Sequence, residues 1–359
     1  MLRHPAVLAV AATVLIVALA GCAQPQASSS HPASMADPKS SPTRTVVAHP
    51  GWPFPIGCAD ILSLDEARTA AGSDLAVTGD ESTPAAGVYD TAIRQGGALQ
   101  CGWSTSSNQG NGLPIASLSV NVLPDASADE QSRVVDSMRL GGDASDPCDQ
   151  GQCGYGGTVA GNAVEITWIT AAHAHDADGG DAAFGAIVSR VTVRLADPGA
   201  HAPRWTAPSG PVPETFCDHG SGREQFIPTV AAALGRDAGT MSSAGGVGGD
   251  PGVIGGSVGR TDLGECAWAS TDADRVFAGI WILAGGAWNL AGWRAAMPDA
   301  RDAGDPAHPG AFVFDDGHGN FALALTSAGS LVEVDFSQTG LTAEQAPARM
   351  IAVARALSL

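Results

Sequence analysis

The chain has 359 residues, with 18 basic and 37 acidic side chains and a formal net charge of -19. Its few lysines and arginines form no cluster that would neutralise phosphates, so the composition excludes nucleic acid as a partner and anionic lipid headgroups as a binding surface. The length allows two domains of ordinary size, and a hydrophobic content of 44% supports folding over most of the chain.

The first 21 residues predict an export signal. Arg3 supplies a positive charge, and residues 6–20 are apolar except for Thr13, a run too short for the roughly 20 residues that cross a bilayer. The run ends in Leu19-Ala20-Gly21-Cys22, which resembles the lipobox of bacterial lipoproteins. The resemblance implies removal of a signal peptide of residues 1–21, lipidation of Cys22 by diacylglycerol and palmitate, and anchoring on the extracytoplasmic face of the cell membrane.

Composition and internal similarity divide the rest of the chain. Residues 22–50 comprise the lipidated cysteine and a stretch rich in Ser, Pro and Ala without apolar periodicity, which predicts a disordered tether. Two later stretches show the same order of expected elements. They predict a first α+β repeat over residues 51–200, a linker over 201–213 and a second α+β repeat over 214–359.

Hydrophobic periodicity predicts the elements of each repeat in chain order. In the first repeat we expect a helix at 64–71, strands at 99–104 and 116–123, a helix at 126–138, a strand at 163–170 and a helix at 182–195. In the second we expect a helix at 224–234, strands at 265–270 and 276–283, a helix at 288–297, strands at 311–314, 320–326 and 331–336, and a helix at 343–357. The segments 80–97 and 240–262 lack periodicity and are expected to be loops that rim a binding surface.

The alternation within strands indicates which residues share a face. Apolar residues of the last strand alternate with Glu333 and Asp335, and those of strand 163–170 alternate around Glu165. Each sheet therefore has one apolar face for helices to cover, and the predicted fold class is α+β, with two tandem similar domains that are each a mainly antiparallel sheet. The three acidic residues then lie on the opposite faces, where we expect solvated carboxylates rather than a catalytic pair.

Six cysteines follow the lipidation site, and they are Cys58, Cys101, Cys148, Cys153, Cys217 and Cys266. An even number in an exported chain favours disulfides, although several pairings are open. Each half has an early cysteine and a later Cys-x-Trp strand, at Cys101-Gly102-Trp103 and Cys266-Ala267-Trp268. The repeat thus predicts Cys58–Cys101 and Cys217–Cys266, and leaves Cys148–Cys153 to close a short loop. Since residues two apart on a strand share a face, we expect Trp103 and Trp268 to be core residues beside these disulfides.

A lipobox, a Ser/Pro tether and domains with an early cysteine and a Cys-x-Trp strand together resemble the secreted lipoproteins of unknown function of mycobacteria and other actinobacteria, here duplicated. The resemblance carries over Cys22, the pairs Cys58 with Cys101 and Cys217 with Cys266, and the two tryptophans. More distantly, the layout is similar to the extracellular sensor domains of mycobacterial receptor kinases. This family has no agreed activity, so the resemblance adds no catalytic residue.

Two patterns invite a chemical interpretation. Gly255-Gly256-Ser257-Val258-Gly259 has the spelling of a hydrolase nucleophile elbow, but we expect a glycine-rich loop here rather than a strand–turn–helix, so we reject that interpretation. The densest cluster of possible metal ligands consists of His173, His175, Asp176, Asp178 and Asp181. Alternate oxygen ligands suit calcium and two histidines suit zinc, but both patterns are incomplete and a solvated turn that caps the next helix fits as well. We therefore expect neither a metal nor a cofactor.

Exclusion and resemblance together favour a non-enzymatic envelope lipoprotein that binds a ligand or partner, as a sensor or accessory protein. The groove between the two domains and the long loops are the expected binding regions. An envelope-acting hydrolase and a structural or assembly factor are the alternatives. The expected partners are the membrane, through the lipid on Cys22, and an envelope ligand or protein.

Overall fold

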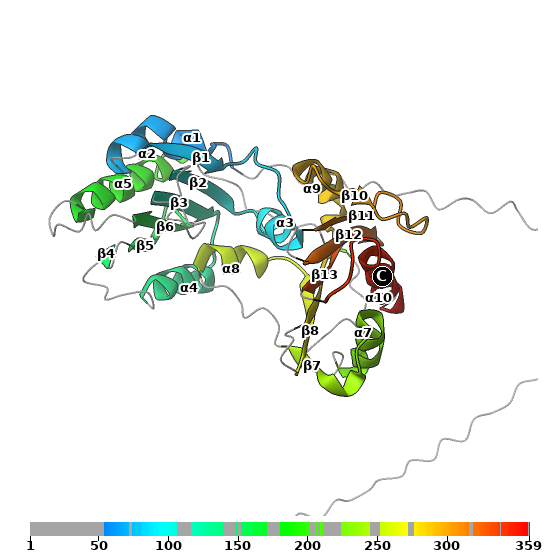
Figure 1. Ribbon diagram of the computed structural model, residues 1–359. Coiled ribbons are helices and arrows are strands. Elements are labelled where there is room, and N and C mark those ends of the chain that lie inside the picture. Colours follow the sequence, from blue (N-terminus) through cyan, green and yellow to red (C-terminus); the bar gives the residue numbers. More distant parts are fainter. Residues whose placement is uncertain are drawn as a thin grey trace, which may run out of the picture. The chain divides into compact units, whose positions relative to one another are not determined.

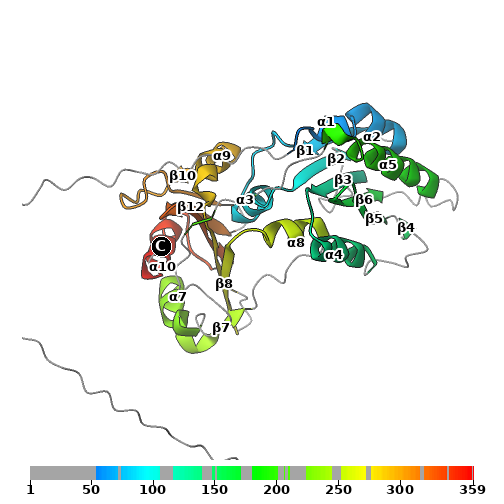
Figure 2. The same cartoon turned by 180° about the vertical axis from the view of Figure 1, so that it is seen from behind.

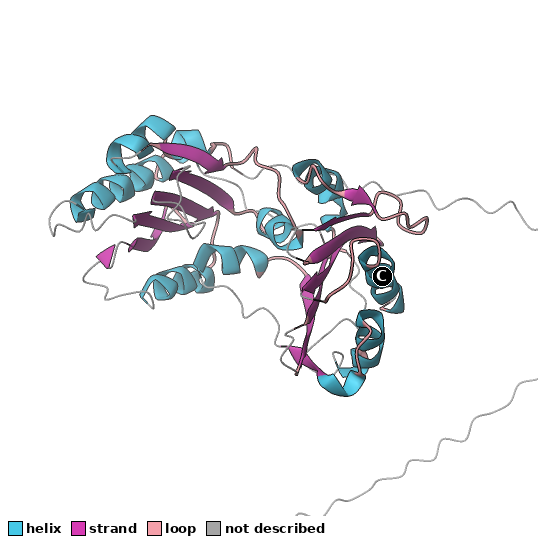
Figure 3. Ribbon diagram, in the orientation of Figure 1, coloured by secondary structure: helices cyan, strands magenta, loops and turns pink. Residues whose placement is uncertain are grey.

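The computed structural model describes residues 54–71, 74–105, 116–139, 148–149, 152–170, 180–200, 206, 209–210, 224–244, 252–271, 276–315, 319–337, 339–357 and 359. They belong to one compact unit, Thr45–Leu359, which contains two antiparallel sheets with helices packed against them (Figures 1 and 3). The α+β class is thereby confirmed. The expected signal peptide, Cys22 and the tether lie outside the described residues. No helix in the described ranges is long and apolar enough to cross a membrane.

The first sheet has the strand order β1 (Leu75–Gly79), β2 (Leu99–Thr105), β3 (Ala116–Leu123), β6 (Asn162–Thr170), β5 (Gln152–Val159) and β4 (Cys148–Asp149). Against one face pack α1 (Cys58–Ile61), α2 (Leu64–Ala71) and α5 (Gly180–Leu195), with a 3-10 turn at Pro198–Ala200 (Figure 1). Trp103, Ile166 and Phe184 are central to this core. The opposite face contacts α4 (Ala128–Arg139).

The second sheet has the order β10 (Arg301–Asp302), β11 (Phe312–Asp315), β12 (Phe321–Ser327), β13 (Ser330–Ser337), β9 (Phe277–Leu283), β8 (Leu263–Ser270) and β7 (Met241–Ala244). One face packs on α7 (Ile227–Leu234) and α10 (Ala346–Ala356), which Figure 2 shows from behind. The other face carries α9 (Leu290–Ala296), and 3-10 turns lie at Ala238–Thr240 and Gly286–Asn289. Trp268 and Val334 belong to the core beneath α7 and α10.

Two helices of the structure lie in segments that the sequence predicts to be loops. They are α3 (Val88–Gln95), in segment 80–97, and α8 (Gly252–Val258), in segment 240–262, which also contains β7. The expectation of loops there is wrong. Both helices are short and α8 is rich in glycine, so neither has the intrinsic stability that a sequence pattern detects, and their packing must stabilise them.

Each of these helices packs against strands that are distant in sequence. Val88 and Ala92 of α3 belong to a buried cluster with residues of β9, β11, β12 and β13. Val253 of α8 belongs to another buried cluster, with Leu123 of β3 and Ala163 of β6. The helices also contact each other (Figures 1 and 2). Each sheet is therefore covered on both faces, although alternation in the strands predicts only one covered face.

Buried hydrogen bonds hold α3, which belongs to the first half of the chain, against the second half. Gln95 Nε2 donates to the carbonyl of Ala284 at 2.6 Å, and Asn289 Nδ2 donates to the carbonyl of Ala85 at 3.0 Å and to Thr91 Oγ1 at 2.7 Å. A buried amide that loses its hydrogen-bond partner destabilises the fold. These hydrogen bonds therefore favour a single position of α3 on the second sheet.

The structure confirms two of the three predicted disulfides. Cys58–Cys101 and Cys148–Cys153 are both formed, as expected. Cys266 is also disulfide-bonded, while its expected partner Cys217 lies outside the described residues. Trp103 and Trp268 are 2% and 0% exposed, so the Cys-x-Trp tryptophans are core residues.

Candidate functional site

Polar side chains lie on the face of the first sheet that is turned away from the Trp103 core. Cys101 and Trp103 point into that core, so Gln100 and Gly102 of β2 face the other way. Gln100 is paired directly with Asn121 of β3, and Gly102 with Ser119. The pairs form the floor of a cavity of about 250 Å³ that we call the Asn121 pocket. Gly102 keeps the floor open, because a Cβ there would approach Thr78 Oγ1 to 3.1 Å.

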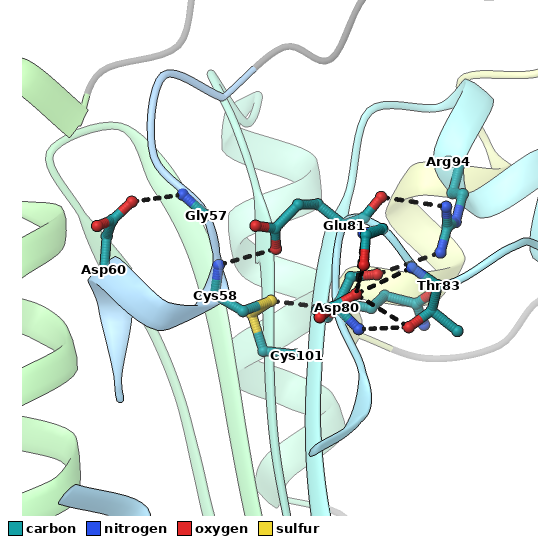
Figure 4. The surroundings of a disulfide bond; sticks show 10 residues. Gly57, Cys58, Asp60, Asp80, Glu81, Thr83, Arg94 and Cys101 are labelled. Atoms are coloured by element: carbon teal, nitrogen blue, oxygen red, sulfur yellow. Dashed lines mark hydrogen bonds between the residues drawn. A yellow bond between two sulfur atoms is a disulfide. The ribbon is translucent and has the colours of Figure 1, made fainter. Parts of the chain in front are cut away.

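One wall of the Asn121 pocket is a turn that follows β1. Asp80 Oδ1 accepts hydrogen bonds from the backbone N–H groups of Ser82 and Thr83, both at 2.9 Å, and from their hydroxyl groups at 2.7 and 3.0 Å. The hydrogen bonds from Ser82, above all, lower the pKa of Asp80. Glu81 Oε2 in turn accepts from the N–H of Cys58 at 3.0 Å, so the turn is fixed to the disulfide (Figure 4).

Another wall is α3, which presents Asp90 and Arg94 one helical turn apart. Arg94 donates to the carbonyl of Asp80 at 3.3 Å and to that of Glu81 at 3.5 Å, as Figure 4 shows. Within the described part of the chain it has no carboxylate within 4.0 Å. Burial lowers the pKa of Arg94 and raises that of Asp90. Attraction between the two charges opposes both shifts, although Asp90 and Arg94 form no ion pair.

Asn121 is the polar side chain of the pocket floor that most requires a partner. It is 7% exposed, yet its amide makes no hydrogen bond among the residues that the structure describes. Its amide atoms also differ from the sealed, unpaired Nδ2 of Asn162, because they retain access to the pocket. Buried polar groups are nearly always hydrogen-bonded, and each exception requires an explanation. A ligand or water in the pocket would satisfy this amide.

A second hollow, of about 510 Å³, lies between α7 and α10. It is lined mainly by small residues, and Arg349 already donates to the carbonyl of Ala232 at 3.1 Å. None of its described lining residues is a buried polar side chain without a partner. The Asn121 pocket is therefore the better candidate for a binding site, although it is smaller.

The acidic residues on the outer sheet faces are partly buried rather than fully solvated, contrary to expectation. Burial raises the pKa of Glu165, and burial together with the nearby charge of Asp335 raises the pKa of Glu333 well above its usual value. Burial also raises the pKa of Asp335 to about 7, and a hydrogen bond from Trp281 opposes this shift. Glu333 and Asp335 interact with each other, and this interaction favours the protonated form of Glu333.

Glu333 and Glu165 cap α3 and α8, the two helices that each pack against the sheet of the other half. Glu333 Oε2 accepts from the N–H of Val88 at 2.9 Å, at the start of α3, and Glu165 Oε2 accepts from the N–H of Val253 at 3.1 Å, at the start of α8. Gly252 is favoured beside Glu165, because its φ of +79° is one that L side chains rarely adopt. A carboxylate near a helix N-terminus satisfies free N–H groups, so these residues have a structural role.

The hydrolase interpretation of Ser257 fails for a reason that differs from the expected one. The segment is not a loop, since Gly252–Val258 forms α8. Ser257 is fully buried and its hydroxyl donates to the carbonyl of Ile93 in α3. Gly96 is in contact with the same turn, where a Cβ would collide with the carbonyl of Ser257. A nucleophilic serine must be exposed to substrate, whereas this one holds two helices together.

The candidate metal ligands remain without a structural test. His173, His175, Asp176 and Asp178 lie outside the described residues, and only the backbone of Asp181, in α5, is described. Among the described residues, no group of three or more His, Cys, Asp or Glu side chains has the arrangement of a metal site.

The Asn121 pocket was not predicted from the sequence. Its floor contains ordinary polar residues of two strands, and its walls come mainly from segment 80–97, which was expected to rim a binding surface but as a loop. In the sequence, polar residues alternate with apolar residues along β2 and β3. A strand with one face in solvent shows the same pattern, so the pattern does not indicate a pocket. Comparisons with protein-family models, with curated proteins and with solved structures find no match to this chain.

Proposed function

We propose that the protein is a lipid-anchored lipoprotein of the cell envelope that binds a small polar ligand in the Asn121 pocket without chemically converting it. The unpartnered amide of the largely buried Asn121, which faces the pocket, is the observation that carries this proposal. The lipobox at Cys22 supports the location on the extracytoplasmic face of the membrane. A sensor or accessory role fits a small binding site tethered in this way.

We also propose that the two sheets descend from an internal repeat that has diverged at the binding site. The strand order β2, β3, β6, β5 is matched by β8, β9, β13, β12, and each Cys-x-Trp strand follows a helix capped by a glutamate of the other half. In register, Asn121 corresponds to Trp281, because each is paired with the residue that precedes the Cys-x-Trp cysteine. The Trp281 ring packs against Tyr89 with centroids 6.1 Å apart, so this position in the second half holds a packed aromatic ring instead of an amide.

Native mass spectrometry of the protein extracted in detergent from its own membrane tests the proposed function. We expect the wild-type protein to retain a small molecule and Asn121→Leu to lose it, because leucine has a similar size and no hydrogen-bonding group. Gln152→Leu, at an exposed position of β5 in the same sheet, is the matched control and should retain the molecule. Retention that is equal in all three proteins would place the ligand elsewhere, and its absence from the wild type would contradict the proposal.

A further inference from the structure

Arg94 and Asp90 together indicate the charge pattern of the ligand. Arg94 has five N–H donors, of which the structure uses two, in long hydrogen bonds to the carbonyls of Asp80 and Glu81. The guanidinium is partly buried beside the cavity and has no carboxylate partner within 4.0 Å among the described residues. A planar carboxylate is the group that matches such a fork, since it can accept two parallel hydrogen bonds.

Asp90 supplies the opposite charge on the same wall. It lies four residues before Arg94 on α3, and both side chains line the pocket. Its carboxylate accepts the backbone N–H of Ala86 and forms no ion pair with Arg94 within 4.0 Å. Oδ1 of Asp80, by contrast, is already saturated by Ser82 and Thr83. The pocket thus presents a positive and a negative group side by side, which attract each other but form no ion pair within 4.0 Å.

The size and the rest of the lining restrict the ligand further. A cavity of about 250 Å³ is smaller than the roughly 300 to 1,000 Å³ of sites for drug-sized ligands. The floor offers the amides of Gln100 and Asn121 and the hydroxyl of Ser119, and no aromatic residue lines the pocket. A sugar or base that binds by stacking is therefore disfavoured, and a compact ligand with polar groups is favoured.

We infer that the Asn121 pocket binds a small zwitterion of the amino-acid or dipeptide class, with its carboxylate on Arg94, its ammonium group on Asp90 and its polar remainder on Asn121 and Gln100. A ligand with only a carboxylate would leave Asp90 unpaired and be repelled by it. A ligand with only an ammonium group would leave Arg94 unpaired and be repelled by it. A zwitterion compensates both charges at once. This inference rests on the proposed function and specifies its ligand.

Isothermal titration calorimetry of the full-length protein tests the charge pattern with probes that leave the protein unchanged. The probes are the common L-amino acids, their Gly-X dipeptides, and the N-acetyl and methyl-ester derivatives of whichever binds. We expect at least one zwitterion to give a saturable one-site isotherm. Each derivative should bind about tenfold more weakly or worse, because each lacks one charge-assisted hydrogen bond. Binding of no zwitterion, or undiminished binding of either derivative, would overturn the inference.

Variants of the two charged residues connect the affinity to the pocket. Arg94→Gln and Asp90→Asn should each weaken the zwitterion about tenfold or more, while Arg190→Gln, on the exposed side of α5, should leave its affinity unchanged. Circular dichroism checks that each variant is folded, and the derivatives above test the same charges in the wild type. If native mass spectrometry finds a retained molecule that depends on Asn121 but lacks an ammonium or a carboxylate group, the inference fails and the proposed function stands. If no mass is retained and no probe binds, both fail.

Discussion

The raised pKa values of Glu333 and Asp335 predict that the protein loses stability as the pH rises from about 4 to about 7. An acid whose pKa is higher in the folded state binds more protons when folded, so unfolding releases protons and becomes easier as the pH increases. Burial raises the pKa of Asp335 from 3.8 to about 7 and raises that of Glu333 as well. The penalty is absent well below pH 4 and grows as the pH rises toward the raised pKa values of the two groups.

The size of the effect follows from the shift. A change of about three pKa units for Asp335 corresponds to as much as about 4 kcal/mol at pH 8. This is an upper bound, because both carboxyl groups remain partly accessible to water. Glu66, held by Arg194, and Asp305, held by His308, have pKa values lowered to about 2. Their contributions are lost only as the pH falls below about 4.5, at the acidic edge of this window.

Urea denaturation at pH 5 and pH 8 measures the effect. We expect the wild-type protein to have a lower free energy of unfolding at pH 8 than at pH 5, and Asp335→Asn to reduce the difference, because an amide keeps the hydrogen bonds without the proton. Asp299→Asn, at an exposed position, serves as the control and should change neither value. Equal stability of the wild type at the two pH values, or an unchanged difference in Asp335→Asn, would refute the reasoning.

Three further outcomes are expected. Cys22→Ser should move the protein from the detergent phase to the aqueous phase or leave it unprocessed, and unchanged partitioning in detergent would contradict lipid anchoring. Peptide mapping without reduction should link Cys217 to Cys266, whereas a free thiol at either position would contradict the predicted pairing. Arg260 forms a bidentate ion pair with Glu130, with donor–acceptor distances of 2.8 and 3.0 Å, and the two side chains are 15% and 12% exposed. Arg260→Met should therefore lower the free energy of unfolding by about 3 kcal/mol, measured by urea denaturation, because it leaves a carboxylate without its partner.

The sequence by itself predicted those features that depend on local period and on covalent pairing. The strand alternation placed Trp103 and Trp268 in the cores, and the repeated Cys-x-Trp pattern predicted the Cys58–Cys101 disulfide. Most of the long elements were found within a few residues of their expected bounds, because their apolar faces are wide enough to show the period of a helix or a strand. The glycine-rich strand β5 was not predicted.

Only the tertiary structure decided what covers the second face of each sheet. Alternation showed that Glu165 and Glu333 lie opposite the apolar faces, but it contains no information about whether a distant segment packs there. Helices α3 and α8 are too short to be stable alone, and they form because they pack on strands far away in the sequence. The same packing buries the acidic residues, seals Ser257 and builds the wall of the Asn121 pocket, so the candidate site depends on long-range contacts that no local pattern specifies.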